Sequence, residues 1–236
     1  MWYPCSSDDA SSIMAAEPPA ATITALESQT NNPDRTSVFL DGEFAFGVHD
    51  DIVVKHELAV GRTLRPEERQ EIERDDQYVR SKQRALDYLA HKPRTEQEVR
   101  RKLHDHNVST TVVEDVVARL HELSYLDDEE YARNYVRNRF ASKKYGPLRI
   151  QRELAKRGID RHLAERAVEE LFADKDLQAV AQTHAEKRWS RLSDEDDIRR
   201  RKQKLYRYLR RRGFPSDTIY SVLDRLERTA RSGESK

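Results

Sequence analysis

Lysine and arginine are the residues of this chain most able to bind a ligand, because they cluster in two segments that contain few Asp or Glu. From Arg133 to Arg161 there are ten Lys or Arg against two Asp or Glu, and from Lys187 to Arg212 there are twelve against four. Like charges so close together repel one another unless a polyanion neutralises them. The two segments favour binding to phosphates or to an acidic protein surface over the alternative of an ordinary solvated face.

The predicted contact residues are bases of these two segments and one aromatic side chain. Tyr145 lies in a Lys-Lys-Tyr-Gly turn, where we expect its ring to be exposed, while most other tyrosines here fall at helical spacing and are expected to pack. We also expect that Lys143, Lys144 and Arg149 can be truncated with little loss of stability. The residues predicted to bind nucleic acid or a nucleoprotein filament are Arg133, Arg137, Lys143, Lys144, Tyr145, Arg149, Arg152, Lys156, Arg199, Arg200, Arg201, Lys202, Arg210 and Arg211.

Other reactive residue types do not form a site in the sequence. The acidic run 127–130 precedes a predicted helix, where carboxylates stabilise the positive helix end, and this interpretation is favoured over a metal site. His104 and His106 stand two apart, so they point to different faces of a helix and do not suit zinc. No Gly-rich phosphate loop and no nucleophile–base pair is present. We therefore predict no catalytic residues, no metal and no cofactor.

Three short helices must position the first basic segment. Apolar spacing predicts helices at about 131–142, 147–157 and 161–172, separated by the Gly146-Pro147 turn and by Gly158. This pattern recurs along the chain. An offset of 51 residues pairs Val99 with Ile150, and an offset of 55 pairs Ile150 with Leu205. Tandem three-helix units with a period near 50 residues are therefore predicted, each burying its apolar stripe partly against its neighbours.

The predicted units share the residue types that begin and end their helices. Asn107, Gly158 and Gly213 occupy equivalent positions between the second and third helices, and Asn and Gly accept the left-handed backbone that often ends a helix. Thr95 and Glu98 have the spacing of a capping box at the start of a second helix. Two helices joined by so short a turn resemble a helix-turn-helix.

A small domain of another kind is predicted before the repeats. Residues 37–40 and 43–48 are rich in β-branched and aromatic side chains and flank Asp41-Gly42, which suits a tight hairpin turn. Helical segments follow, one of them starting at Pro66 with acids in its first turn. The expected divisions are 1–36 disordered tail; 37–80 small acidic domain with a β-hairpin and helix; 81–125, 126–173 and 174–228 three-helix units; and 229–236 disordered tail.

Composition agrees with a mainly α, elongated fold of this kind. Apolar and charged residues each make up 36% of the chain, which suits thin helical units better than one large core. The zero net charge divides into −9 over residues 1–80 and +9 over the remainder. Cys5 is the single cysteine, and no run of about 20 apolar residues is present. We expect a cytoplasmic monomer with no membrane contact.

The ordered set of motifs resembles the RecX family. The resemblance rests on the stretch Leu-Asp-Asp-Glu-Glu-Tyr-Ala at 126–132, on Gly-Pro-Leu-Arg-Ile at 146–150, and on Glu153-Leu154 and Gly158-Ile159, and it covers about residues 37–226. It implies a non-enzymatic protein that lodges in the groove of the RecA–DNA filament and restrains recombinase activity and ATP hydrolysis, with a role in DNA repair, recombination and the SOS response. RecA and single- or double-stranded DNA, through its phosphates, are then the implied partners.

Two other classes of function remain open on the residues alone. Tandem helix-turn-helix units could read a defined duplex site as a transcription factor. The predicted third helix at 161–172, however, carries few base-reading residues besides Arg161, His162 and Arg166. A helical scaffold for a protein partner is the third hypothesis, with the charge incidental.

Overall fold

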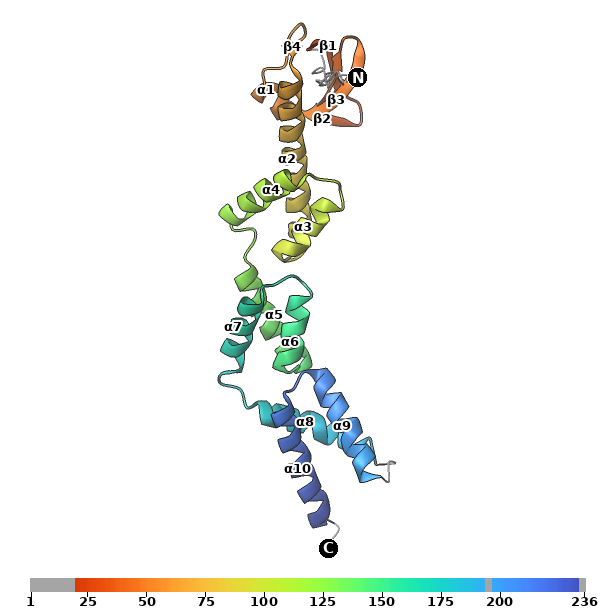
Figure 1. Cartoon of the computed structure of the whole chain (residues 1–236), viewed down its shortest axis with the longest axis vertical. Helices are drawn as coiled ribbons and strands as arrows, with labels where there is room; N and C mark the ends of the chain where they lie inside the picture. The colour runs from red at the N-terminus through yellow and green to blue at the C-terminus, as the bar shows by residue number, and fades with distance from the viewer. Residues whose placement is uncertain (1–19, 194–196, 234–236) are drawn as a thin grey trace, which may run out of the picture. The chain divides into compact units, whose positions relative to one another are not determined.

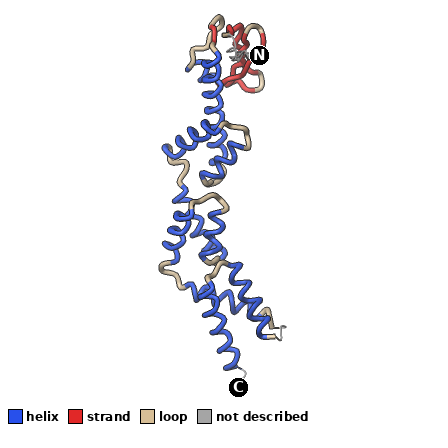
Figure 2. The backbone as a smooth tube through the Cα atoms, viewed as in Figure 1, coloured by secondary structure: helices blue, strands red, loops and turns tan. Residues whose placement is uncertain are grey.

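The computed structural model describes residues 20–193 and 197–233. The chain divides into two compact units, one up to Lys82 and one from Gln83 onward, which we call the N-terminal domain and the helical domain. The described residues contain four strands, all in the N-terminal domain, and ten helices (Figure 1, Figure 2). None of the helices in these ranges combines the length and the apolar character that a membrane crossing requires.

The N-terminal domain is built on a four-stranded antiparallel sheet of order β3-β2-β1-β4. Its strands are β1 (Ala21–Gln29), β2 (Asn32–Leu40), β3 (Glu43–His49) and β4 (Thr63–Leu64). The hairpin predicted around Asp41-Gly42 is confirmed, since Leu40 pairs with Glu43 and both turn residues have positive φ angles of 50° and 92°. Two positive φ values in succession are the signature of the tight turn that matches strand twist.

The predicted disordered tail is wrong from residue 21 onward, because β1 and the first part of β2 lie within 1–36. Residues 1–19 lie outside the described residues. The pairing of β1 with β2 shifts register between Ile23 and Ala25. Such an irregularity interrupts the strict alternation of apolar and polar residues by which a strand is recognised in a sequence.

Two helices complete this domain. α1 (Asp50–Lys55) follows β3 directly, and α2 (Pro66–Ala90) begins here and ends in the helical domain. The helices and the sheet share one apolar core, in which Ile23, Val38, Val48 and Ile72 are fully buried.

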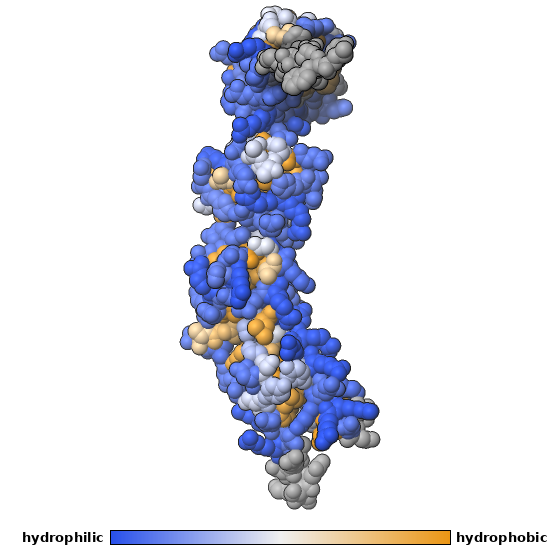
Figure 3. Space-filling view, viewed as in Figure 1, coloured by the Kyte–Doolittle hydropathy of each residue, from blue (hydrophilic) through white to orange (hydrophobic). Residues whose placement is uncertain are grey.

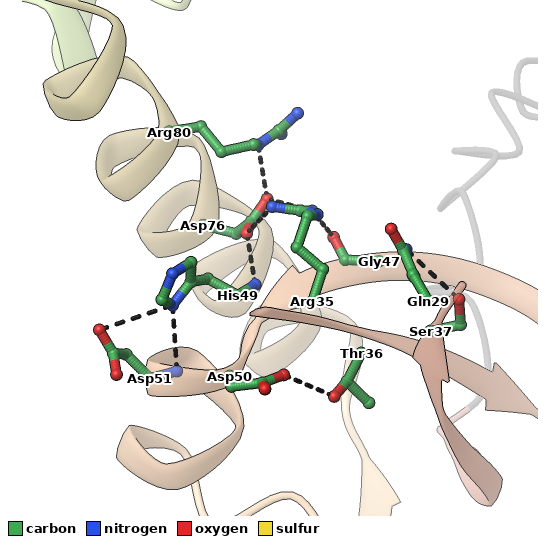
Figure 4. A network of polar contacts seen from close by, with 10 residues as sticks. All are labelled: Gln29, Arg35, Thr36, Ser37, Gly47, His49, Asp50, Asp51, Asp76 and Arg80. Atoms are coloured by element: carbon green, nitrogen blue, oxygen red, sulfur yellow. Dashed lines mark hydrogen bonds and ion pairs between the residues drawn. The ribbon is translucent and has the colours of Figure 1, made fainter. Parts of the chain in front are cut away.

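Asp76 of α2 joins the helix to the sheet through a buried ion pair (Figure 4). Its carboxylate accepts hydrogen bonds from both terminal nitrogens of Arg35 at 3.0 and 3.2 Å and from the backbone N–H of His49 at 2.8 Å. Arg80 lies one helical turn further along α2 and pairs with the same carboxylate at 2.8 Å. Every polar atom of the Asp76 side chain is thus satisfied, as burial of a charge requires.

The helical domain repeats one three-helix arrangement. The end of α2 with α3 (Glu96–His104) and α4 (Thr110–Glu122) forms the first repeat. α5 (Asp128–Lys143), α6 (Pro147–Ala155) and α7 (Arg161–Phe172) form the second. α8 (Leu177–Ser190), α9 (Ile198–Arg212) and α10 (Ser216–Gly233) form the third, so residues 229–233 are helical instead of disordered as predicted. Residues 234–236 lie outside the described ranges.

The apolar positions that match between the repeats form their cores. Ile150 and Leu154 of α6 are fully buried in the second repeat, and their partners at the predicted offset, Leu205 and Leu209 of α9, are fully buried in the third. The turns match as well, because Asn107, Gly158 and Gly213 have φ angles of 56°, 81° and 93°. The tandem three-helix architecture is therefore confirmed.

Neighbouring repeats meet through the same joint each time. In the first joint, the Thr95 hydroxyl at the start of α3 donates to the carbonyl of Arg157, beside the second repeat's glycine turn, at 2.6 Å. In the second joint, the backbone N–H of Gly146 at the start of α6 donates to the carbonyl of Arg212 at 2.9 Å. Leu148 extends this second joint with an N–H bond to the carbonyl of Gly213 at 3.1 Å.

Candidate nucleic-acid interface

The joint between the second and third repeats brings five bases together from three helices. Lys143 and Lys144 end α5, Arg149 lies in the first turns of α6, and Arg211 and Arg212 end α9. Arg212 donates from Nη1 to the carbonyl of Lys143 at 3.2 Å, and Arg149 donates from Nη1 to the carbonyl of Arg211 at 3.3 Å. Residues more than 60 positions apart in the sequence thus form one basic cluster, which we call the joint cluster.

The ring of Tyr145 lies close to two guanidinium groups of this cluster. The Cζ of Arg149 stands 3.7 Å from its ring centroid, and the Cζ of Arg212 stands 5.5 Å away. The ring is half-buried, so the prediction of an exposed Tyr145 is wrong. Cation–π contacts of this kind hold cationic groups in place. Tyr145 therefore packs the joint and presents little surface for stacking on a base.

Arg149 and Arg212 also hold the joint by hydrogen bonds. Arg149 donates from Nε to Glu153 at 3.0 Å. Arg212 donates from Nε to Tyr208 at 3.2 Å and approaches Nδ1 of His184 with Nη2 at 3.2 Å. The side chain of Arg149 is half-buried and packed against the joint. From these contacts we now expect its removal to lower stability, in place of the small effect expected from the sequence.

His184 of α8 bridges the same joint. Its Nε2 lies 3.1 Å from the carbonyl of Lys144, while Nδ1 faces Arg212. Burial lowers the pKa of His184 below its usual range, and the positive charge of Arg212 lowers it further. The ring is therefore neutral at neutral pH, with Nε2–H donating to the carbonyl and Nδ1 accepting from the guanidinium. Neither His184 nor Arg212 was among the predicted site residues. The sequence did place Arg212 in the basic segment that ends with it, and Arg212 matches Arg157 at the repeat offset of 55.

Several other predicted contact residues are engaged inside the protein. Arg133 pairs with Glu129 at 2.8 Å, and Arg200 pairs with Asp197 at 3.5 Å. Both pairs form within a single helix or its first turn, so each base already has an acidic neighbour close in sequence.

The other two engaged bases tie α9 to its neighbours. Arg201 is half-buried and donates to the carbonyl of Trp189 at 2.7 Å, with its Cζ 4.1 Å from that ring. Lys202 forms an ion pair with Glu227 of α10. A base with such partners must break a contact before it can bind a phosphate, which weakens the net gain.

The remaining predicted bases expose their charged ends. Arg152 and Arg210 use one N–H each inside the protein, on the carbonyl of Leu148 at 2.9 Å and on the hydroxyl of Tyr206 at 3.1 Å. A guanidinium has five N–H donors, so most of each remains for a partner. Arg137 is similar, with one bond to Asn134 at 2.9 Å. Besides Arg200, which is exposed although it pairs with Asp197, the exposed predicted bases are Arg137, Lys143, Lys144, Arg152, Lys156, Arg199, Arg210 and Arg211.

Tyr135 shows why the basic segment holds together without a ligand. Its hydroxyl donates to Glu153 at 2.8 Å, and the Cζ atoms of Arg139 and Arg157 lie 4.9 and 4.7 Å from its ring. Burial alone would raise the pKa of Glu153, but the hydrogen bonds from Tyr135 and Arg149 lower it below its usual range. One ionised carboxylate therefore pairs with two arginines, Arg139 at 3.2 Å and Arg149 at 3.0 Å, and part of the predicted repulsion is cancelled internally.

The acidic run 127–130 forms the N-cap and first turn of α5 and has the helix-capping role expected of it, although the helix begins three residues earlier than predicted. Asp127 accepts from the backbone N–H of Glu130 at 2.8 Å. Asp128 accepts from the backbone N–H of Glu96 at 2.9 Å and so adds to the joint between the first and second repeats. Among the described residues, no group of three or more His, Cys, Asp or Glu is placed to hold a metal ion.

Family models match four consecutive parts of the chain. The model of the RecX N-terminal domain matches residues 21–65, and those of the first, second and third three-helix domains of RecX match 82–120, 127–168 and 174–223. The first of these spans the β-sheet, and the other three coincide with the three repeats. Together they cover well over half of the chain.

Relatives and solved structures agree with the family models. The regulatory protein RecX of Bacillus subtilis is 34% identical over 209 residues, covering 87% of this chain and 77% of that protein. RecX of Leuconostoc citreum is 32% identical, with 87% and 76% covered. A crystal structure of regulatory protein RecX superimposes with a TM-score of 0.67 at 29% identity, covering 86% of this chain and 99% of the other. From its domain order, its repeats and these relatives, the chain belongs to the RecX family of regulatory proteins.

Proposed function

We propose that this protein binds the RecA–DNA filament and restrains recombinase activity and ATP hydrolysis by binding alone. The observation that carries the proposal is the set of exposed bases on or next to α5, α6 and α9, helices that meet at the joint of the second and third repeats. Charged side chains presented by packed helices bind a polyanion without a large ordering cost. Family membership supports RecA as the target, since the family's name denotes regulation.

DNA phosphates or an acidic protein surface would both satisfy these bases. The residues best suited to substitution are Lys143, Lys156 and Arg211, because their side chains are exposed. Arg149 and Arg212 are poor choices because they stabilise the joint, and their loss would confuse binding with folding.

The test is the rate of ATP hydrolysis by RecA on single-stranded DNA, measured with increasing amounts of this protein. We expect the rate to fall as the protein approaches stoichiometry with the filament. Replacing Lys143, Lys156 and Arg211 together with Ala should weaken the effect and lower the salt slope of filament binding, by about 0.7 for each phosphate that the variant no longer neutralises. An unchanged hydrolysis rate at stoichiometric protein would refute the proposal.

A matched control removes the same charge elsewhere. Arg101, Arg166 and Arg225 are exposed bases of the helical domain outside the predicted set. Their joint replacement by Ala should leave the effect on RecA close to that of the unaltered protein. An equal loss in both triple variants would mean that overall charge, and not this surface, determines binding.

The transcription-factor hypothesis has less support from the structure. Arg161 at the start of α7 pairs with Glu165 at 2.8 Å, so the third helix of the second repeat offers little to a base edge. Selection on random duplex DNA separates the two functions, because a transcription factor should enrich a defined sequence and a filament regulator should not.

A further inference from the structure

A groove of about 600 Å³ crosses the joint of the second and third repeats. Its floor is apolar and includes Leu148 of α6, Ile159 and Phe214. Leu148 is 44% exposed, so a partner in the groove could cover its side chain. Figure 3 shows small apolar patches on an otherwise hydrophilic face, including some near the level where α6 and α9 meet. Ile159 and Phe214 belong to the cores of the second and third repeats and are only 4% and 1% exposed, so Leu148 supplies most of the apolar surface that a partner could cover.

Arginines from three helices stand around this floor. Arg152 of α6, Arg161 of α7 and Arg210 of α9 line the groove, together with Glu165. Arg161 is neutralised by its ion pair with Glu165 at 2.8 Å, which leaves Arg152 and Arg210 as the net charge of the rim. Each of these two donates one N–H to a neutral oxygen of the protein, and neither forms an ion pair with a carboxylate within residues 20–193 and 197–233.

We propose that this groove binds an acidic peptide segment carrying an apolar anchor residue. The anchor would cover Leu148, while carboxylates on either side of it would meet Arg152 and Arg210. A guanidinium presents paired N–H groups that match a carboxylate in a bidentate contact. The volume falls in the range of small-ligand and side-chain pockets. The proposal adds a protein-binding site to the filament contact and does not depend on RecA being that partner.

The apolar floor is what distinguishes a peptide from nucleic acid here. A phosphate backbone gains from the two arginines but gains nothing from covering a leucine. Burying apolar surface stabilises a complex by about 25 cal/mol for each Å². A peptide with an aromatic or aliphatic anchor gains this free energy in addition to that of its charge contacts. Leu148 and the arginine pair therefore fit a segment that is both acidic and amphipathic.

Fluorescence anisotropy of the full chain with a labelled synthetic peptide tests the site without RecA. The probe is Asp-Glu-Glu-Phe-Leu-Glu-Glu-Asp, and its partner replaces Phe-Leu with Ser-Ser at the same charge. We expect saturable binding of the first peptide and at least about tenfold weaker binding of the second. Replacing Leu148 with Ser should reduce that difference between the two peptides.

The charge contacts are tested by a matched pair of double variants. R152E/R210E should weaken binding of the first peptide by about tenfold or more, because each lost charged hydrogen bond alone reaches that scale. R152Q/R210Q should lie between it and the unaltered protein. R166E/R225E makes the same change of charge at exposed positions outside the groove and should weaken binding by less than about threefold. Circular dichroism checks that each variant is folded.

Three results would overturn the proposal. The first is the absence of saturable binding, or equal binding of the two peptides. The second is an equal loss in R152E/R210E and R166E/R225E. The third is that an oligothymidylate displaces the peptide and that R152E/R210E weakens binding of the oligothymidylate by the same factor as binding of the peptide. The groove would then be a nucleic-acid site. Failure of the RecA assay would leave all of these measurements unaffected.

Discussion

Replacing Gly213 with Ala tests the joint between the second and third repeats most directly. Gly213 ends α9 with a φ of +93°, and its carbonyl accepts the N–H of Leu148. A Cβ built there would stand 2.8 Å from the Cα of Arg149 and closer still to its N and Cβ. Backbone atoms of a helix cannot move aside as a flexible side chain does, so the two repeats must separate.

The cost can be worked from two contributions. A side chain in the left-handed conformation costs about 1–2 kcal/mol. Separation of the repeats also removes the bonds from the N–H groups of Gly146 and Leu148, each with a net value of about 0.5–1.5 kcal/mol. The sum is about 2–5 kcal/mol. A domain of this size loses about 2–4 °C of Tm for each kcal/mol, so a loss of about 3 kcal/mol should lower the Tm by roughly 6–12 °C.

Asn107→Ala is the matched control, because Asn107 occupies the equivalent turn of the first repeat with a φ of +56° and is exposed. It changes the left-handed residue without touching a neighbouring repeat, and we expect a loss of no more than about 1 kcal/mol. Urea unfolding gives both values. Hydrogen exchange should also show faster exchange of the Gly146 and Leu148 amides in Gly213→Ala. Equal losses in the two variants, with unchanged exchange, would refute the account of the joint.

Three further predictions concern single side chains. Asp76→Ala leaves the guanidinium of Arg35 largely buried without its partner and should cost about 3–5 kcal/mol in urea unfolding; a loss below about 1 kcal/mol would contradict this. Burial raises the pKa of Asp128, so the native state holds this proton more tightly than the unfolded state, and stability falls as pH rises through the native pKa. Asp128→Asn can still accept the hydrogen bond from the N–H of Glu96 but carries no charge. The stability of this variant minus that of the unaltered protein should therefore be larger at neutral pH than near about pH 3; an equal stability difference at the two pH values would argue against this account. Thr95→Val removes a buried cap and a bond across the first joint and should cost about 1–3 kcal/mol by thermal melting, with Thr95→Ser restoring most of it.

The repeat architecture could be predicted from the sequence because its signals are local and periodic. Ile150 and Leu205 mark the same buried position of two repeats, and Gly158 and Gly213 mark the same turn. Each of these depends on helix geometry within one repeat. The Asp41-Gly42 hairpin was predictable for the same reason, since a two-residue turn carries its own backbone requirement.

Strand β1 and the setting of Tyr145 could not be predicted from local pattern. The register shift near Ile23 interrupts the alternation of β1, so residues 21–29 resemble a polar tail in sequence. Tyr145 follows two lysines and precedes a glycine, which is typical of an exposed turn. It is half-buried, and two guanidinium groups lie over its ring: that of Arg149, four residues on, and that of Arg212, which lies 67 positions later in the third repeat. The second of these contacts is the one that local sequence cannot show. No window of neighbouring residues contains that contact.

By itself, the sequence determined the repeat period, the left-handed turns and the excess of positive charge in the helical domain. All three follow from residue type and spacing, because backbone preference and formal charge belong to each residue alone. Only the tertiary structure decided which bases remain exposed to a partner. Arg149 and Arg211 have the same charge, yet Arg149 is packed into the joint while Arg211 is exposed. Charge is a property of the side chain, whereas its availability depends on the partners that folding brings within bonding distance.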